Sequence, residues 1–191
     1  MTPIICVAEI PAAVLSEILT TAYTDGVDFP PSLVLIHDAP ALAKPDIGEE
    51  PTQLPTANIA SYPFLSHSIA SIVKYLRENA PSSVAPDHVL IADAQTITDK
   101  TLLFVDCAYD MNVSPEEAKT LRLSAEKANT IPVAIAVATM GIDEVVAIAD
   151  QDGSFEEHQH PARVRLFVGF VFHYVLVKIL AFPPQNVSQK L

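Results

Sequence analysis

The chain has 191 residues, of which 50% are hydrophobic and 18% are charged, so it is long and apolar enough to form a folded domain. Its 11 basic and 23 acidic residues give a net charge of −12 with no basic stripe, which argues against nucleic-acid partners and anionic membrane surfaces. Neither of the common glycine-rich phosphate-binding motifs occurs, which excludes the usual nucleotide-binding fingerprints.

The first third of the chain predicts two buried strands joined by a helix. Short apolar runs at residues 3–10 and 32–38 are typical of buried strands. Between them, apolar residues at helical spacing follow Pro11 and predict a helix that ends near Asp25. The chain begins without the basic segment of a secretory signal, and its two cysteines cannot form a disulfide framework. We therefore expect a cytoplasmic protein.

Residues 39–61 predict a long surface loop or lid. Four prolines in this segment each remove a backbone donor and prevent regular pairing. Helically spaced apolar residues then predict a second helix over residues 63–80, which ends before Pro81.

The middle of the chain predicts a hairpin followed by further helices. Strand-like runs at residues 88–94 and 101–109 flank a turn that contains residues 98–100. A helix start is expected at Ser114. Residues 121–140 are ambiguous, because their first half is typical of a helix and their second half of a strand or a buried helix. A short helix is expected over residues 143–149.

The segment 163–182 is rich in Val, Phe and Tyr, which favours a long strand. Only twelve residues separate Arg165 from Lys178, so a membrane span would require Lys178 to snorkel, and no span is expected. An exposed edge strand of this kind favours a homo-oligomer. The predicted architecture is one α/β (α+β) domain over residues 1–160, with a mixed sheet of five to six strands and flanking helices. Residues 161–191 are expected to form an aromatic-rich C-terminal strand or interface segment.

Several short motifs resemble those of a known family. Ala92-Asp93, residues 96–99 (TITD), Val105-Asp106 and Asp152-Gly153-x-Phe155 are similar to the motifs of a family of small uncharacterised α/β proteins, a domain of unknown function. The resemblance extends over roughly three-quarters of the chain, although Ala138-Thr139 replaces asparagines of the family pattern. It implies a compact α/β fold and no particular activity.

Four residues are candidates for acid–base chemistry. Asp93 and Asp106 follow adjacent predicted strands, where a pair of carboxylates could share a proton. His37 and His88 lie at strand termini, and a histidine beside a carboxylate can act as a general base. The alternative is structural for all four, because Asp often caps turns and His often lies hydrogen-bonded in a core.

Other candidate sites rest on single features. Phe172, His173 and Tyr174 could line an apolar substrate pocket or a subunit interface. The acidic and histidine-containing run at residues 156–160 contains metal-ligand types but no third-ligand pattern, so we interpret it as a solvated turn and expect no metal. Cys107 has apolar neighbours, which argues against a nucleophile.

Two classes of function remain after these exclusions. The first is a cofactor-independent enzyme that acts on an apolar small molecule as an isomerase, cyclase or lyase, by acid–base chemistry and shape. The Pro-rich segment favours this class because it resembles an active-site lid. The alternative is a non-catalytic module that binds a ligand or another protein.

Overall fold

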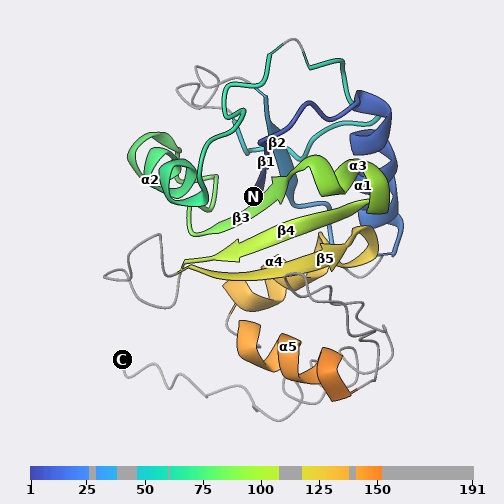
Figure 1. The fold of residues 1–191 in the computed structure, drawn as a ribbon, viewed down its shortest axis with the longest axis vertical. Coiled ribbons are helices and arrows are strands. Elements are labelled where there is room, and N and C mark those ends of the chain that lie inside the picture. Colours follow the sequence, from blue (N-terminus) through green and yellow to red (C-terminus); the bar gives the residue numbers. More distant parts are fainter. Residues whose placement is uncertain (26–28, 38–46, 60, 108–117, 138–140, 152–191) are drawn as a thin grey trace, which may run out of the picture.

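The computed structural model describes residues 1–25, 29–37, 47–59, 61–107, 118–137 and 141–151. Five strands form one mixed sheet in the order β2-β1-β3-β4-β5, with helices on both faces (Figure 1). The single α/β domain expected from the sequence is therefore confirmed. The strands are β1 (Thr2–Cys6), β2 (Leu33–Ile36), β3 (His88–Ala92), β4 (Thr101–Asp106) and β5 (Lys119–Ser124). The helices are α1 (Ala12–Asp25), α2 (Ile69–Asn79), α3 (Ala94–Asp99), the 3-10 helix η3 (Ala125–Lys127), α4 (Thr130–Ala136) and α5 (Ile142–Gln151).

The direction of each strand follows from its connection. β1 pairs in parallel with β2 and with β3, and helices α1 and α2 lie in the long crossovers that parallel pairing requires. The connection from β3 to β4 is short, and β4 is antiparallel to β3 and to β5. In this register His88 lies opposite Asp106, and Asp106 lies opposite Lys119.

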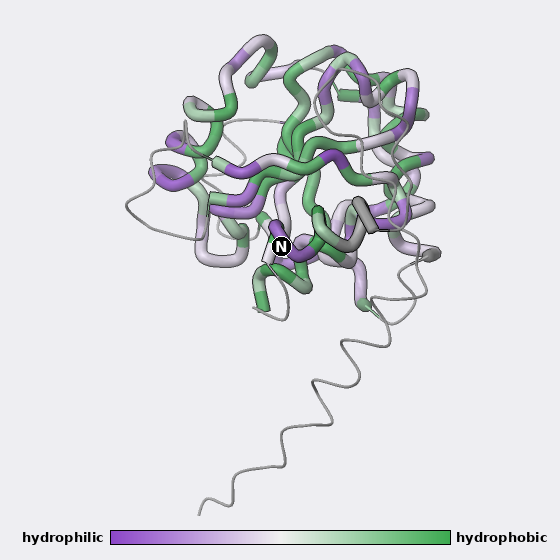
Figure 2. The backbone as a smooth tube through the Cα atoms, turned by 60° about the horizontal axis from the view of Figure 1, so that its bottom comes forward, coloured by the Kyte–Doolittle hydropathy of each residue, from purple (hydrophilic) through white to green (hydrophobic). Residues whose placement is uncertain are grey.

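Alternating side chains give the sheet two apolar faces. The first face packs against α1, η3, α4 and α5, and it includes Leu90 of β3 and Phe104 of β4. The second face packs against α2, and it includes Val89 and Ile91 of β3. Figure 2 shows the corresponding concentration of hydrophobic residues in the central strands.

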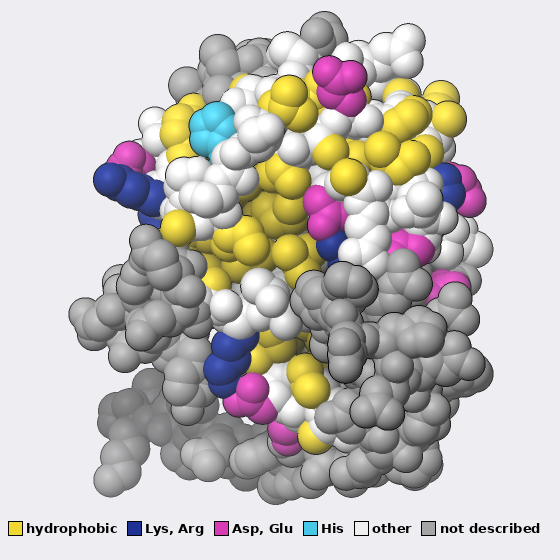
Figure 3. Space-filling view, in the orientation of Figure 1, with side chains coloured by type: hydrophobic (Ala, Val, Ile, Leu, Met, Phe, Trp, Pro, Cys, Tyr) yellow, Lys and Arg dark blue, Asp and Glu magenta, His cyan; other side chains and the backbone are white. Residues whose placement is uncertain are grey.

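The second face is not completely covered. Val7, Ile69 and Leu103 pack against its core and remain partly exposed. Figure 3 shows hydrophobic side chains gathered in a hollow between α2 and α3. We call the surface around Val7, Ile69 and Leu103 the open apolar face.

Local capping explains where the helices begin. The helix expected from residue 63 begins at Ile69, because the Ser68 side chain accepts a hydrogen bond from the Ser71 backbone N–H. Residues 63–66 form a turn instead. Helix α1 and the expected helix over residues 143–149, which is part of α5, are confirmed.

The turn expected between β3 and β4 is a six-residue helix, α3. Asp93 caps it by accepting a hydrogen bond from Thr96 N–H, and Thr96 Oγ1 accepts one from Asp93 N–H. This reciprocal capping box stabilises a helix that is too short to be recognised from periodicity. Lys100 ends α3 in the left-handed conformation, with φ of 58°.

The helical interpretation of residues 122–129 is wrong over its first part. Arg122, Leu123 and Ser124 belong to β5, and the chain turns into η3 only at Ala125. Pairing with β4 overrides the weak helical preference of these residues. Residues 130–136 form α4, in agreement with the buried-helix alternative.

The described part of the Pro-rich segment, residues 47–59, contains no helix or strand. Thr52 donates its backbone N–H to Leu33 O, and its hydroxyl accepts a hydrogen bond from Leu35 N–H. The Thr56 hydroxyl donates to Ala12 O at the start of α1. These bonds hold the segment along the outer edge of β2, the edge that has no strand partner in the sheet, and the segment covers that edge.

Among the described residues, no helix is both long and apolar enough to cross a membrane. The helix expected from Ser114 and the segment 161–191, with Phe172, His173 and Tyr174, lie outside the described residues.

Candidate functional site

The candidate site lies where β3 begins and β4 ends. Nε2 of His88 is 3.4 Å from Oδ1 of Asp106, and both side chains are buried on the first face of the sheet. The His88 ring also stacks on Phe104, with ring centroids 6.2 Å apart. From the sequence, His88 and Asp106 are two separate candidates, and the antiparallel pairing of β3 with β4 brings them together.

One atom in this pair is unusual. Nε2 of His88 is buried and has no hydrogen-bond partner among the described residues, because its contact with Asp106 lacks hydrogen-bond geometry. His88 as a whole is 9% exposed. Buried polar atoms are nearly always hydrogen-bonded, so an unsatisfied nitrogen requires an explanation, such as strain or a catalytic role.

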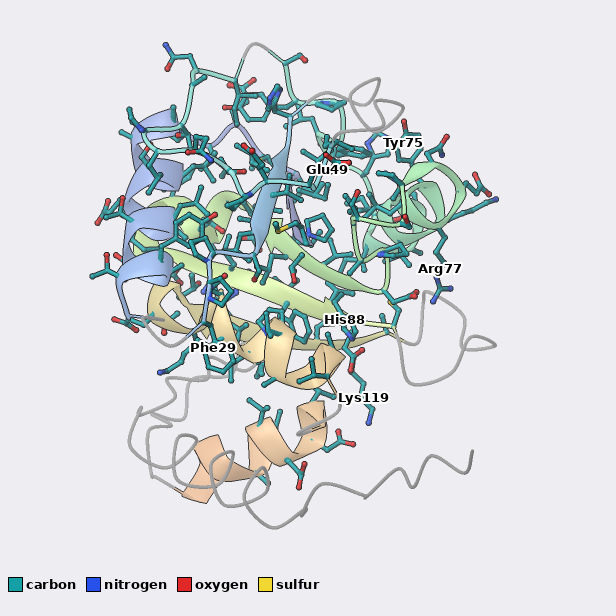
Figure 4. All side chains as sticks on the ribbon, turned by 180° about the vertical axis from the view of Figure 1, so that it is seen from behind. Phe29, Glu49, Tyr75, Arg77, His88 and Lys119 are labelled. Atoms are coloured by element: carbon teal, nitrogen blue, oxygen red, sulfur yellow. The ribbon has the colours of Figure 1, made fainter. Side chains whose placement is uncertain are left out.

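A row of charged residues extends from this pair to solvent. Lys119 of β5 lies opposite Asp106, and its ammonium group forms an ion pair with Asp143 of α5. Lys119 and Asp143 are exposed, whereas His88 and Asp106 are buried. Figure 4 shows His88 and Lys119 at the same edge of the sheet. The row therefore connects a buried imidazole with the surface near the start of α5.

Arg77 of α2 fixes the strand ends that contain this pair (Figure 4). Its Nε donates to Asp87 Oδ1 at 2.7 Å, and its Nη2 donates to Cys107 O at 3.3 Å. Cys107 N–H in turn donates to Asp87 O. Because Asp87 precedes His88 and Cys107 follows Asp106, these bonds restrict the movement of both side chains of the pair.

The predicted pairing of Asp93 with Asp106 is wrong. β3 and β4 are antiparallel, so Asp93 lies after the end of β3 at one edge of the sheet, and Asp106 lies at the other. The offset corresponds to five residues of strand, about 17 Å. The two carboxylates cannot share a proton at this separation.

Asp93 has a complete set of protein partners. One carboxylate oxygen accepts from Thr96 N–H, and the other pairs with Nη2 of Arg122. Arg122 also donates to the Thr101 hydroxyl and is 6% exposed. This arrangement supports the structural alternative for Asp93, a helix cap joined to β5.

The carboxyl ends of β1 and β3 are where open α/β sheets of this strand order usually bind ligands. Here Val7 N–H donates to Ala92 O, and Val7 O accepts from Ser66 N–H. Protein groups therefore occupy the hydrogen-bonding positions nearest to Asp93. His37 follows β2 at this edge and is exposed, while its neighbour Asp38 lies outside the described residues.

Both cysteines are buried and reduced, as expected for Cys107. Burial raises the pKa of the Cys6 thiol to about 12. Burial also raises the pKa of Cys107, although the nearby Arg77 guanidinium lowers it. Neither thiol has the lowered pKa of a cysteine nucleophile.

The sequence did not identify Arg77, Lys119 or Arg122 as functional neighbours. Arg122 lay in a segment interpreted as helical, and Lys119 preceded that segment. No group of three or more His, Cys, Asp or Glu residues that could hold a metal occurs in the described part of the chain. The run at residues 156–160 is outside that part.

The family model described as Domain of unknown function (DUF6924) matches residues 48–158, about 60% of the chain. The chain belongs to this family. The DUF6924 match includes His88, Asp93 and Asp106, and it confirms the resemblance to a family of uncharacterised α/β proteins. It begins after β2, so it is shorter than the three-quarters expected from the motifs. No curated protein and no solved structure matches the chain.

Proposed function

We propose that this DUF6924 protein is a cofactor-independent enzyme that transfers protons on an apolar small molecule. His88 is the acid–base group, and Asp106 is a positioning residue that orients the imidazole. The observation behind this proposal is the buried, unsatisfied Nε2 of His88 at 3.4 Å from a buried carboxylate.

The pair has the composition that acid–base catalysis requires. Histidine exchanges protons readily near neutral pH, and a carboxylate beside the ring selects its tautomer and stabilises its protonated form. A small rotation of either side chain would convert the 3.4 Å contact into a hydrogen bond. Contacts of this kind often tighten only when the substrate binds.

The surroundings of the pair favour an apolar substrate. His88 stacks on Phe104, which belongs to the larger apolar cluster that α4 and α5 cover. Isomerisation, cyclisation and elimination of an apolar molecule need a defined shape and one or two proton-transfer groups. Lys119 and Asp143 would then lie at the solvent end of the site.

The test is turnover in a metabolite extract. Purified protein is incubated with the extract, and the products are compared by mass spectrometry with those of a boiled sample. We expect a product that forms only with active protein, and a loss of about 100-fold or more in His88→Gln. His67→Gln is the matched control, because His67 is an exposed histidine whose Nδ1 lies near Leu65 O.

Asp106→Asn distinguishes positioning from a purely structural role. If Asp106 orients His88, this variant lowers the rate and also moves the pH–rate profile, because asparagine cannot stabilise the imidazolium. Full turnover in His88→Gln would contradict the proposal. A metabolite that is retained unchanged would support the alternative, a non-catalytic binding module.

A further inference from the structure

The second face of the sheet is less completely covered over β4 than over β3. Ile91 of β3 is 2% exposed, whereas Leu103, its direct neighbour on β4, remains partly exposed. The apolar side chains of α2 that pack on this face are Ile72, Val73 and Leu76. The first face, in contrast, packs against three α-helices and η3. A hollow between α2 and α3 is left on the second face (Figure 3).

The open apolar face has a polar boundary on one side. Leu103 lies opposite Arg122 on β5, and Arg122 pairs with Asp93 at the start of α3. Val7 marks the other side, just beyond β1. An apolar surface with a charged boundary is typical of a docking site for another segment or partner.

The charges of the chain are distributed very unevenly. Residues 158–191 contain four basic residues and no acidic residue, a net charge of +4. Residues 1–157 contain the other 7 basic residues and all 23 acidic residues, a net charge of −16. The two parts therefore attract each other.

The basic part also contains the most apolar segment of the chain. Fifteen of the 20 residues at 163–182 are hydrophobic, so this segment needs a cover in water. Eleven residues, 152–162, connect it with the end of α5. A connection of this length can extend to about 36 Å, which is comparable with the size of a small domain.

We infer that the open apolar face is the docking site of residues 163–182 of the same chain. The attraction between the +4 and −16 parts brings the segment to the domain, and burial of its Val, Leu and Phe side chains against Val7, Ile69 and Leu103 holds it there. The inference does not depend on the acid–base proposal, because the face and the His88–Asp106 pair lie on opposite sides of the sheet.

Limited proteolysis of the full chain tests the inference. Trypsin can cleave after Arg163, Arg165 and Lys178, and a docked segment is cleaved only when it opens. In Leu103→Asp we expect cleavage at these sites to be about tenfold faster than in the wild type. The matched control is Leu54→Asp, because Leu54 is an exposed leucine of the segment that lies along β2. The cleavage rate of this variant is expected to equal that of the wild type.

A second measurement keeps the result clear if Leu103→Asp destabilises the fold. Circular dichroism checks whether Leu103→Asp is folded. If Leu103→Asp is unfolded, the milder Leu103→Gln is used in its place. Hydrogen exchange of residues 101–106 is then compared between the wild type and the full-length variant Val171→Asp/Val175→Asp, which places two charges in the docking segment. Slower exchange in the wild type supports docking, and equal exchange overturns it.

Two further measurements, dilution of the protein and addition of lipid vesicles, test whether a second copy of the chain or a membrane covers the open apolar face instead. Cleavage that is independent of protein concentration supports docking within one chain. Protection that disappears on dilution, together with a dimer in sedimentation, overturns the inference in favour of a second copy. Equal cleavage in Leu103→Asp and the wild type also overturns it, as does protection that occurs only with vesicles of anionic phospholipid.

Discussion

The β3–β4 hairpin places an acidic residue at each edge of the sheet, and the two carboxylates have different surroundings. Asp93 caps α3, pairs with Arg122 and is joined through it to Thr101. Asp106 lies beside an imidazole nitrogen that is buried without a hydrogen bond. From the sequence, the two residues are equivalent candidates, since each follows a predicted strand.

The difference teaches that the partners of a carboxylate indicate its role better than its position in the chain. A carboxylate with a full set of hydrogen bonds and a buried cation stabilises the fold. A carboxylate beside an unsatisfied nitrogen keeps a geometry that is not optimal for stability, which is more typical of a functional site.

The largest expected effect is at the Asp93 edge. Asp93→Ala removes the cap of α3 and leaves the buried Arg122 without its anion, so we expect the free energy of unfolding to fall by about 3 kcal/mol. Urea denaturation measures it, with Glu78→Gln as a control for loss of one exposed acidic residue. A loss equal to that of the control would show that the ion pair contributes nothing.

A smaller effect is expected from the residue that fixes the other edge. Arg77→Met breaks the bonds to Asp87 and to the Cys107 carbonyl. The side chains of Arg77 and Asp87 are partly exposed, so the expected loss of stability is about 1 to 2 kcal/mol. Lys74→Met is the control, because Lys74 lies exposed on the same helix. If both variants unfold at the same urea concentration, Arg77 does not restrain this edge.

The two buried cysteines allow the two ends of the strands to be compared through the loss of stability at high pH. The pKa of Cys6, at the Asp93 edge, is raised from 9.0 to about 12, so its contribution to stability is complete below pH 9 and is lost as the pH rises toward 12. At pH 9.5 the expected loss in the free energy of unfolding is about 1 kcal/mol. Cys6→Ala should remove this loss when urea denaturation at pH 8 and pH 9.5 is compared.

Cys107 provides the control for that experiment. Arg77 lowers its pKa against the effect of burial, so Cys107→Ala should change the pH dependence less than Cys6→Ala does. An equal change in both variants would indicate that the two thiols have the same surroundings.

The smallest expected effect is at His88 itself. His88→Phe retains the stacking on Phe104 and removes the unsatisfied nitrogen, so the free energy of unfolding should change by less than about 1 kcal/mol. Urea denaturation again measures it. A loss as large as that in Asp93→Ala would assign His88 to the core and contradict its functional role.

Much of the fold could be predicted because its signals are local. The apolar runs that form β1, β2, β3 and β4, and the helical spacing in α1, are visible over a few residues. The elements that were missed depend on partners. β5 forms because β4 lies beside it, and α3 forms because Asp93 and Thr96 cap each other.

The candidate site was predicted only in part, for the same reason. The sequence identified His88 and Asp106 as acid–base types at strand ends, which is a local property. It could not identify Arg77, whose partners Asp87 and Cys107 lie next to the ends of β3 and β4. Nor could it identify Lys119, which becomes a neighbour of Asp106 only through the β4–β5 register.

The sequence by itself determined the class of fold, the membership of DUF6924 and the residues that could exchange protons, because patterning, motifs and side-chain chemistry are written in the chain. The tertiary structure decided which of those residues meet. The short connection through α3 makes β4 antiparallel to β3, which separates Asp93 from Asp106 and places Asp106 beside His88. The direction of a strand depends on the length and path of the connection that precedes it, and it cannot be deduced from the side chains of the strand.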